Sequence, residues 1–410
     1  MKISHGQAFS NKMSVSFASL FWGFAAYAVF FAPWLKGRGF DSEEVAFILA
    51  IALVVRSIFG PIGALLADGF KYKKTPLVLM NLLTSLSAVA LYFVDNYVSI
   101  FIVVMFYSIA TAAVVPILEG LAIKGADKFG FDFGRTRLWG SVAFIISSYA
   151  CGKAIDAFGL DAFITWLLMG AVASTIASFI LPVLPANDQE DGENSEQAKP
   201  PKFDLTGAMM MIKHPIFITI LVTVSFVHAS HAVFYGFSAI HWASLGYSSE
   251  LIGILWAIGV FAEVLLFIYS GRITSIFGPR RMLMLAAAAA ILRWVILAFD
   301  PILPLVFFAQ TLHGLTFGAV YLGSLNLISR SVPDNLISTA MAINLSLNTG
   351  VFMSVALVIS GWLYADYANL TYWFGALLGF IALIMALGLK FIWNGEALNF
   401  SQKQKQKSTN

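Results

Sequence analysis

Long apolar stretches separated by short polar ones follow one another from residue 13 to residue 393. Each stretch is about 20 residues long, and an α-helix of that length crosses a hydrocarbon core of about 30 Å. The pattern therefore predicts an all-α membrane protein with twelve spanning helices. The predicted spans are 13–35, 45–67, 76–95, 98–123, 138–157, 162–184, 215–240, 250–271, 281–299, 302–328, 338–363 and 369–393.

Composition supports the same class. The 410-residue chain is 59% hydrophobic and 11% charged, with a mean hydropathy of +0.82, whereas soluble domains carry about 25% charged residues. The one cysteine, Cys151, lies in the fifth span and excludes an internal disulfide and a cysteine-based metal cluster. The sequence contains no glycine-rich phosphate loop ending in Lys-Ser/Thr. We therefore expect no enzyme, no cofactor and no ATP-driven transport.

The basic residues predict the orientation, because Lys and Arg accumulate on the cytoplasmic side of a membrane. With both termini in the cytoplasm, 20 of the 25 Lys and Arg residues lie on that side, three lie opposite, and Arg56 and Arg293 lie inside spans. A multi-pass protein of the inner (cytoplasmic) membrane is expected. The net charge of +3 follows from this arrangement and requires no nucleic acid. The expected partners are membrane lipid and a small-molecule substrate, with the chain acting as a monomer.

An internal repeat divides the chain into two sets of six spans. The segment GFDSEEVAFILAI at 39–51 aligns without gaps on GYSSELIGILWAI at 246–258, at an offset of 207 residues. Between the two sets, residues 185–204 are polar, acidic and flanked by prolines, as is typical of a linker. The predicted division is an N-terminal half (1–184), a cytoplasmic linker (185–213), a C-terminal half (214–394) and a cytoplasmic tail (395–410).

Five ionisable residues lie within or at the start of spans: Arg56, Glu119, Arg137, Glu263 and Arg293. A charge at the centre of a spanning helix costs about 2.5–3.5 kcal/mol on insertion scales, so each one requires a partner. Arg56 falls on Glu263 at the repeat offset. We expect Arg56 to have a structural role, holding the two halves together through a charge pair across their interface.

Polar residues at helical spacing mark two further spans. His228, His231 and Tyr235 are three and four residues apart, which places them on one helical face, and we expect this face to line a cavity. The alternative is that the histidines hydrogen-bond neighbouring helices. No carboxylate lies in register with them, so no metal site is expected. The same spacing recurs in the tenth span at Gln310, His313 and Phe317.

Twelve spans in two halves related by a parallel repeat resemble the major facilitator superfamily, whose site lies at the midplane between the halves. The loop GALLADGFKYKK at 63–74 keeps the glycine, the aspartate and the basic cluster of that superfamily. The segment PILEGLAIKGADKFGFDFGRTRLWG at 116–140 resembles the connection between spans four and five of the oligosaccharide:proton symporters, the lactose permease group. HAVFYGFSAIHW at 231–242 and LWAIGVFAEVLLF at 255–267 are similar to the 3-phenylpropionic acid transporters of the same superfamily.

The resemblance implies roles for particular residues. Glu119 and Arg137 would hold substrate between spans four and five, Glu263 would be a substrate carboxylate, and Arg293 and His313 would belong to a proton and substrate network. The symporters carry a glutamate three residues after the span-ten histidine, where this chain has Thr316. The candidate substrate-binding residues are Glu119, Arg137, His231, Tyr235, Glu263, Arg293 and His313, and the candidate proton carriers are Glu263, His313 and Glu119.

These features predict a secondary active transporter that works by alternating access. The expected activity is proton-coupled import of a small organic solute, such as an aromatic carboxylate of the phenylpropionate kind, whose charge Arg293 would neutralise. A sugar or nucleoside proton symporter is the alternative, with Glu119, Arg137 and Glu263 as hydrogen-bonding groups. A non-transporting membrane sensor and an intramembrane enzyme are the alternatives of other classes. Neither a soluble sensory domain nor a catalytic constellation is evident in the sequence.

Overall fold

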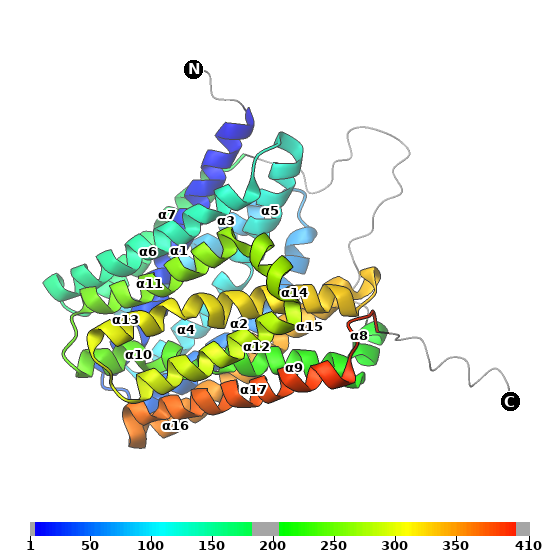
Figure 1. The fold of residues 1–410 in the computed structure, drawn as a ribbon. Helices are drawn as coiled ribbons and strands as arrows, with labels where there is room; N and C mark the ends of the chain where they lie inside the picture. The colour runs from blue at the N-terminus through cyan, green and yellow to red at the C-terminus, as the bar shows by residue number, and fades with distance from the viewer. Residues whose placement is uncertain (1–4, 183–204, 399–410) are drawn as a thin grey trace.

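The computed structural model describes residues 5–182 and 205–398, and these residues are almost entirely helical (Figure 1). Eleven helical stretches among them are long and apolar enough to cross a membrane. The last, 337–392, holds 56 residues, about 84 Å of helix at 1.5 Å per residue. Its backbone turns at Ala368, where φ is 45°. This stretch therefore makes two crossings, and the prediction of twelve spans is confirmed.

The first half contains six spans. They are α1 (His5–Gly37), α2 (Ser42–Asp68), α3 (Lys74–Ala90) with the 3₁₀ turn η1 (Leu91–Phe93), α4 (Tyr97–Ala112) continued by α5 (Val114–Phe129), α6 (Phe133–Phe158) and α7 (Ala162–Ile180).

The second half also contains six spans, several of them interrupted. After the short helix α8 (Leu205–Ile212), the seventh span is α9 (Pro215–Ala229) with α10 (Ala232–Ser244), the eighth is α11 (Ser249–Ile268) and the ninth is α12 (Ser270–Ala298). The tenth span is α13 (Leu303–Thr311) with the π-helical η2 (Gly314–Ala319) and α14 (Val320–Ser331). The eleventh is η3 (Asp334–Leu336) and α15 (Ile337–Leu345) with the π-helical η4 (Ser346–Phe352) and α16 (Met353–Tyr367), and the twelfth is η5 (Ala368–Thr371) with α17 (Tyr372–Ile392).

The internal repeat is visible in how α2 and α11 begin. These helices start at Ser42 and Ser249, which are 207 residues apart, the offset of the sequence alignment. Each has a side-chain cap at the preceding residue. Asp41 accepts a hydrogen bond from the backbone N–H of Glu44 at 2.8 Å, and Ser248 accepts one from Leu251 at 3.2 Å. Caps of this kind satisfy N–H groups that lack intrahelical partners, so the aligned segments start equivalent helices.

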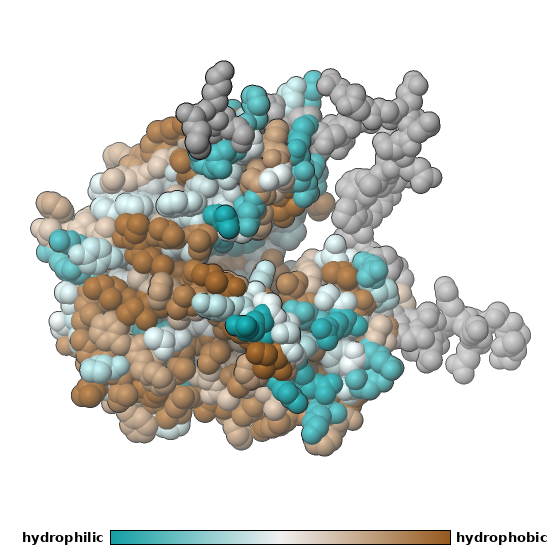
Figure 2. Space-filling model, turned by 45° about the horizontal axis from the view of Figure 1, so that its top comes forward, coloured by the Kyte–Doolittle hydropathy of each residue, from teal (hydrophilic) through white to brown (hydrophobic). Residues whose placement is uncertain are grey.

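The two halves meet at one end of the molecule and separate at the other. An even number of crossings places both chain ends on one side, here named the terminal side. Away from it, α6 packs along α11 and α2 along α16. Figure 1 shows α6 and α11 side by side on the left and α5 and α8 standing apart on the right. Figure 2 shows the hollow between the halves, with hydrophobic side chains covering much of the outer surface, as contact with lipid requires.

The contact between α6 and α11 closes the side opposite the chain ends. A methyl group on Gly152 would clash with the backbone of Ser249, and one on Gly253 would clash with the carbonyl oxygen of Ser148. The Asp156 carboxylate, from the first half, accepts hydrogen bonds from the N–H groups of Ser249 and Glu250, each at 2.8 Å. One half of the molecule therefore caps a helix of the other, beside a glycine-to-backbone contact.

Replacing Asp156 with alanine should weaken this closure. Loss of a helix cap costs about 0.5–2 kcal/mol, and here the cost falls only on the conformation in which the halves touch on this side. The assay uses a cysteine introduced at Ala28, in the cavity wall, with the buried Cys151 replaced by serine. We expect this cysteine to react faster in Asp156→Ala than in the protein with native Asp156 when a membrane-impermeant thiol reagent is applied from the side opposite the chain ends. Asp156→Asn, which keeps one acceptor oxygen, should react at an intermediate rate. Equal rates in all three proteins would show that the cap does not hold the closed side.

Parts of the predicted domain division lie outside the described residues. This holds for most of the linker, for the final residues of the first half, and for residues 399–410 of the tail. Within the predicted linker, α8 is helical and packs against α9 and α15. The division at 184, 213 and 394 stays a prediction.

Candidate functional site

A cavity of about 1150 Å³ lies between the halves. Its walls come from α1, α2, α5 and α6 of the first half and from α10, α11, η2, α14 and α16 of the second. Asp132, Gly134 and Arg135, at the connection between α5 and α6, also line it, so the cavity opens on the terminal side. Eleven of the lining side chains are Phe, Tyr or Trp: Phe21, Phe24, Tyr27, Phe133, Phe144, Phe234, Tyr235, Trp256, Phe267, Phe317 and Tyr321.

The first polar group of the wall is the predicted pair of Glu119 and Arg137. Helix α6 begins at Phe133, five residues earlier than predicted, because Asp132 caps it by accepting from the Arg135 N–H at 3.0 Å. Arg137 therefore lies inside the helix, and its Nε donates to Glu119 Oε1 on α5 at 3.2 Å. The guanidinium also lies over the ring of Phe21, 4.2 Å from its centroid. The pair forms within the cavity wall, as expected.

Arg135, two residues earlier, has a different environment. Its side chain is 89% exposed, and its Nε lies 3.7 Å from Asp132 Oδ2 at the mouth of the cavity. Arg135 thus lies at the mouth of the cavity, whereas Arg137 lies within its wall.

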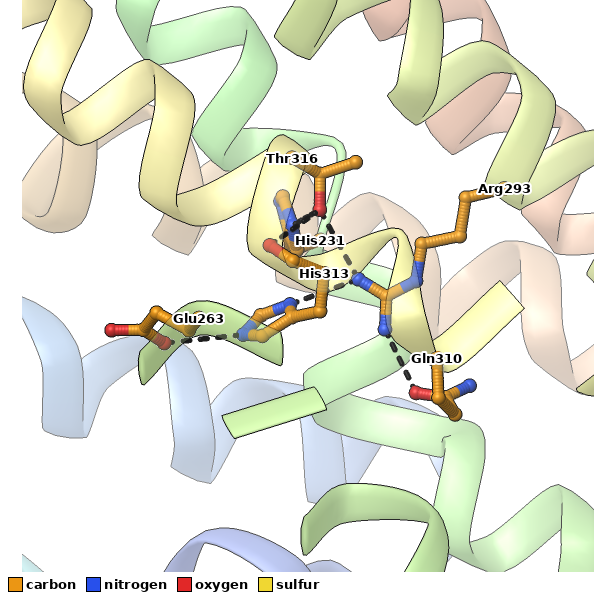
Figure 3. A network of polar contacts seen from close by, with 6 residues as sticks. All are labelled: His231, Glu263, Arg293, Gln310, His313 and Thr316. Atoms are coloured by element: carbon orange, nitrogen blue, oxygen red, sulfur yellow. Dashed lines mark hydrogen bonds and ion pairs between the residues drawn. The ribbon is translucent and has the colours of Figure 1, made fainter. Parts of the chain in front are cut away.

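A second polar group is fully buried beside the cavity (Figure 3). Arg293 of α12 donates from Nη2 to Gln310 Oε1 at 2.9 Å, and from Nη1 to His313 Nδ1 at 2.9 Å and Thr316 Oγ1 at 3.3 Å. Arg293, Gln310 and Thr316 are 0% exposed. All three acceptors are neutral groups of the tenth span, and the buried Nε of Arg293 has no hydrogen-bond partner among the described residues.

Aromatic rings provide further stabilisation for Arg293. Its Cζ lies 4.5 Å from the ring centroid of Phe234 and 4.6 Å from that of Trp294. A guanidinium over a desolvated ring gains about 2 kcal/mol. Phe234 lines the cavity, whereas Arg293 does not. Arg293 is thus separated from the cavity and reaches it only through His313.

The hydrogen bonds fix the tautomer of His313. An arginine can only donate, so His313 Nδ1 must accept from Arg293 and the ring proton resides on Nε2. His313 Nε2 faces Glu263 Oε2 of α11 at 3.8 Å. Glu263 and His313 both line the cavity. A carboxylate open to the cavity is therefore linked to the buried arginine by one neutral imidazole (Figure 3).

The same reasoning fixes the tautomer of His231. Backbone carbonyls only accept, so His231 Nδ1 donates to Val227 O at 3.0 Å. His231 Nε2 then accepts from the Thr316 hydroxyl at 2.9 Å, and that hydroxyl oxygen accepts from Arg293. His231 is 0% exposed and does not line the cavity. Thr316 therefore joins His231 to the arginine, whereas the His313 ring contacts the arginine directly.

The expectation that His228, His231 and Tyr235 share one cavity-lining face is wrong for the two histidines. The helix of this span is broken, with α9 ending at Ala229 and α10 beginning at Ala232. Tyr235 lines the cavity and its ring stacks on that of His231 at a centroid distance of 5.6 Å, whereas neither histidine lines the cavity. The alternative that they bond neighbouring helices describes His231.

Of the seven predicted site residues, the structure brings five into the cavity wall and two behind it. In the wall are Glu119, Arg137, Tyr235, Glu263 and His313. Behind it are His231 and Arg293. The expectation that Arg293 neutralises a substrate carboxylate directly does not fit its position, because Phe234 and His313 lie between its guanidinium and the cavity.

The expectation for Arg56 is also wrong. No ion pair joins Arg56 to an acidic residue in the described part of the chain. Its Nε and Nη2 instead donate to Thr111 Oγ1 of α4, at 3.3 and 3.0 Å, within the first half. Arg56 lines the cavity, across which Glu263 lies in the opposite half. The repeat offset gave no sign that Arg56 is held within its own half.

Comparison with known proteins places the chain in a family. A profile described as the MFS_1 like family matches residues 12–376. The chain belongs to the MFS_1 like family. It is 28% identical, over 375 residues, to the probable 3-phenylpropionic acid transporter of Escherichia coli (strain K12), covering 91% of this chain and 96% of the relative. It is 24% identical, over 351 residues, to the maltose permease of Geobacillus stearothermophilus, covering 84% and 85%.

Solved structures show the same fold. The nucleoside transporter NupG superposes with a TM-score of 0.78 at 15% identity, covering 94% of this chain and 99% of that one. A bacterial homologue of the human lysosomal transporter Spinster, in an inward-facing and unoccupied conformation, superposes with a TM-score of 0.71 at 12% identity, covering 95% and 98%. The predicted major facilitator fold is confirmed.

This MFS_1 like protein is a multi-pass membrane transporter, and its family and relatives are transporters rather than enzymes. The cavity between its halves is the candidate substrate site, because midplane sites at the interface of the repeats are typical of this architecture.

Proposed function

We propose that this transporter imports a small aromatic carboxylate of the 3-phenylpropionate kind together with protons, by alternating access across the inner membrane, as a monomer. The observation that carries the proposal is the cavity itself, which combines eleven aromatic side chains with arginines of the first half. Aromatic rings supply apolar surface for a substrate ring. A guanidinium binds a carboxylate through paired, charge-assisted hydrogen bonds. The relative from Escherichia coli carries a name of the same substrate class.

Alternating access needs a cavity that opens on one side at a time. In this conformation the α6–α11 contact closes one side, and the cavity opens on the terminal side, which the basic residues predict to be cytoplasmic. The conformation is therefore the one from which an importer releases its substrate. Opening the opposite side would require separation of Asp156 from α11.

A sugar or nucleoside symporter is the second candidate. It is favoured by the likeness to the maltose permease and by the carboxylates Glu119 and Glu263 in the cavity wall, which can accept hydrogen bonds from hydroxyl groups. The aromatic lining and the arginines favour the acid over this alternative.

The two candidates differ in the ligands that should stabilise the folded protein. A ligand that binds only the native state raises stability by about 2.7 kcal/mol at 100 times its dissociation constant. We expect 3-phenylpropionate to raise the melting temperature of the purified protein, its amide to raise it less at the same concentration, and maltose and uridine to leave it unchanged. Stabilisation by maltose or uridine, without an effect of the acid, would favour the second candidate.

Glu263 is the proposed principal proton carrier. Its side chain is 20% exposed to the cavity and faces the Nε2 of His313, and no arginine or lysine side chain lies within 4 Å of it among the described residues. Such a carboxylate can gain and lose a proton without breaking an arginine or lysine pair. His313 and Glu119 are the further candidates.

Replacing Glu263 with glutamine should separate coupling from exchange. In proteoliposomes with an inward proton gradient, Glu263→Gln should lose accumulation of labelled substrate, because glutamine cannot carry a proton. Exchange of internal for external substrate should continue. Glu43→Gln, which changes an exposed carboxylate at the start of α2, is the matched control and should accumulate normally. Accumulation that persists in Glu263→Gln would assign the proton to His313 or Glu119 instead.

A further inference from the structure

The cavity wall contains three arginines and three acidic residues: Arg56, Arg135, Arg137, Glu119, Asp132 and Glu263. Two of the arginines are paired. Arg137 lies 3.2 Å from Glu119, and Arg135 lies 3.7 Å from Asp132 at the exposed mouth. Among the described residues, Arg56 is thus the one cavity-lining arginine that no acidic group neutralises.

The contacts of Arg56 orient its guanidinium without neutralising it. The Thr111 hydroxyl donates its own hydrogen to Tyr107 O at 2.9 Å, so its oxygen is left to accept from Arg56 Nε and Nη2. One edge of the planar guanidinium is held by this neutral acceptor. Nη1, on the other edge, makes no hydrogen bond within the described part of the chain and is available for an oxygen ligand. A guanidinium positioned in this way is prepared to bind a carboxylate.

Aromatic rings lie beside the same group. Tyr27 of α1 lies beside Arg56, with 5.7 Å between Cζ and the ring centroid. Tyr27 in turn stacks on Phe31 and Tyr107, at centroid distances of 4.6 and 5.3 Å. Tyr27 lines the cavity, so a flat ring and an unneutralised cation are presented together. Fourteen residues separate Arg56 from the first residue of α2, or about 21 Å of helix, which places it well inside a bilayer.

We propose that Arg56 binds the carboxylate of the substrate and thereby sets the preference for an acid, with Thr111 as the residue that positions it. The bound anion supplies the negative charge that the protein does not provide at this position. Glu263 lies in the wall contributed by the opposite half, at the repeat-equivalent position, so the anion sits across the cavity from the proposed proton carrier. This assignment rests on the proposed function and specifies which group of the cavity recognises the substrate.

The test compares binding of 3-phenylpropionate and 3-phenylpropionamide to the purified full-length protein by titration calorimetry. The native protein should bind the acid about 10- to 100-fold more tightly than the amide, the range expected for a hydrogen bond to a charged group. Arg56→Gln should lose this preference while its affinity for the amide is unchanged. Arg56→Lys keeps the charge but loses the planar pair of donors, so its preference for the acid over the amide should lie between that of the native protein and that of Arg56→Gln.

Two further variants separate recognition from folding. Thr111→Val keeps the shape of the side chain and leaves Arg56 charged but unoriented, so affinity for the acid should fall about 3-fold with no change for the amide. Arg330→Gln, at an exposed position on α14 outside the cavity wall, should bind both ligands as the native protein does. A merely structural role for Arg56 would weaken acid and amide equally.

Two outcomes would overturn the assignment in different ways. Equal affinity of the native protein for acid and amide would refute the proposed function and the role of Arg56 with it. A native preference for the acid that persists in Arg56→Gln and Arg56→Lys would leave the function intact and place the carboxylate on another group, with Arg137 the next arginine of the wall.

Discussion

Uptake should fall about 30-fold when either Glu119 or Arg137 is replaced by glutamine. Removing one partner of a buried, hydrogen-bonded charge pair costs about 2–5 kcal/mol. The two side chains are 37% and 27% exposed, so solvent screens the group that is left and the lower end of that range applies. Because 1.36 kcal/mol corresponds to a factor of ten, about 2 kcal/mol gives about 30-fold. Initial rates of labelled uptake in vesicles, normalised to the amount of protein in the membrane, provide the measurement.

The control for this pair is Arg135→Gln. Arg135 lies two residues before Arg137 on the same helix but is 89% exposed at the mouth, so its loss should change uptake less than about 2-fold, as is usual for exposed ion pairs. If Glu119→Gln and Arg137→Gln transport at native rates, the pair has no part in binding or in the movement of α5 against α6.

Replacing Gly253 with valine should shift the transporter away from the conformation of this structure. Its α-carbon packs on the Ser148 carbonyl of the other half, and any β-carbon would clash with that backbone. Overpacking costs about 1–3 kcal/mol, which lowers the population of the closed side about 5- to 150-fold. Uptake should fall by a similar factor, and a cysteine at Ala28 should become reactive toward an impermeant reagent from the side opposite the chain ends.

Gly388→Val is the matched control for this substitution. A β-carbon at Gly388, on α17, would meet no atom within 4 Å, so the same change of residue should leave uptake and labelling at native values. Native uptake in Gly253→Val would mean that the halves need not approach this closely during transport.

Hydropathy predicted the spans well because each must be about 20 apolar residues long to cross the membrane, whatever it packs against. The repeat located the equivalent helices, since Asp41 and Ser248 are both capping residues followed by the same apolar pattern. The roles of Glu119 and Arg137 followed from the resemblance of residues 116–140 to the oligosaccharide:proton symporters, whereas the insertion cost indicated only that each charge needs a partner.

The side of each spanning helix that faces the cavity could not be predicted in the same way. A side chain that faces lipid and one that faces another helix are both apolar, so hydropathy does not distinguish them. The regular helix is also interrupted at residues 230–231 and in η2, and no Pro lies at either place to indicate it. His231 and Arg293 consequently lie behind the cavity, although spacing and charge suggested that they face it.

Arg56 illustrates a related limit. A burial cost shows that an intramembrane arginine needs polar partners, but it does not show whether they are acids or hydroxyl groups. The partner, Thr111, is one of many threonines in the sequence and carries no signal of this role. Only the three-dimensional arrangement shows that Arg137 is paired with an acid while Arg56 is held by a hydroxyl group.

The central claim is that a proton gradient drives accumulation of an aromatic acid through this cavity. The most direct test is the level of labelled 3-phenylpropionate inside proteoliposomes that contain the purified protein, with the exterior more acidic than the lumen, compared with protein-free liposomes that report passive entry of the neutral acid. We predict protein-dependent accumulation above the passive level, collapse of this excess by a protonophore, and loss of it in Glu263→Gln. Accumulation identical in liposomes with and without the protein would contradict the account.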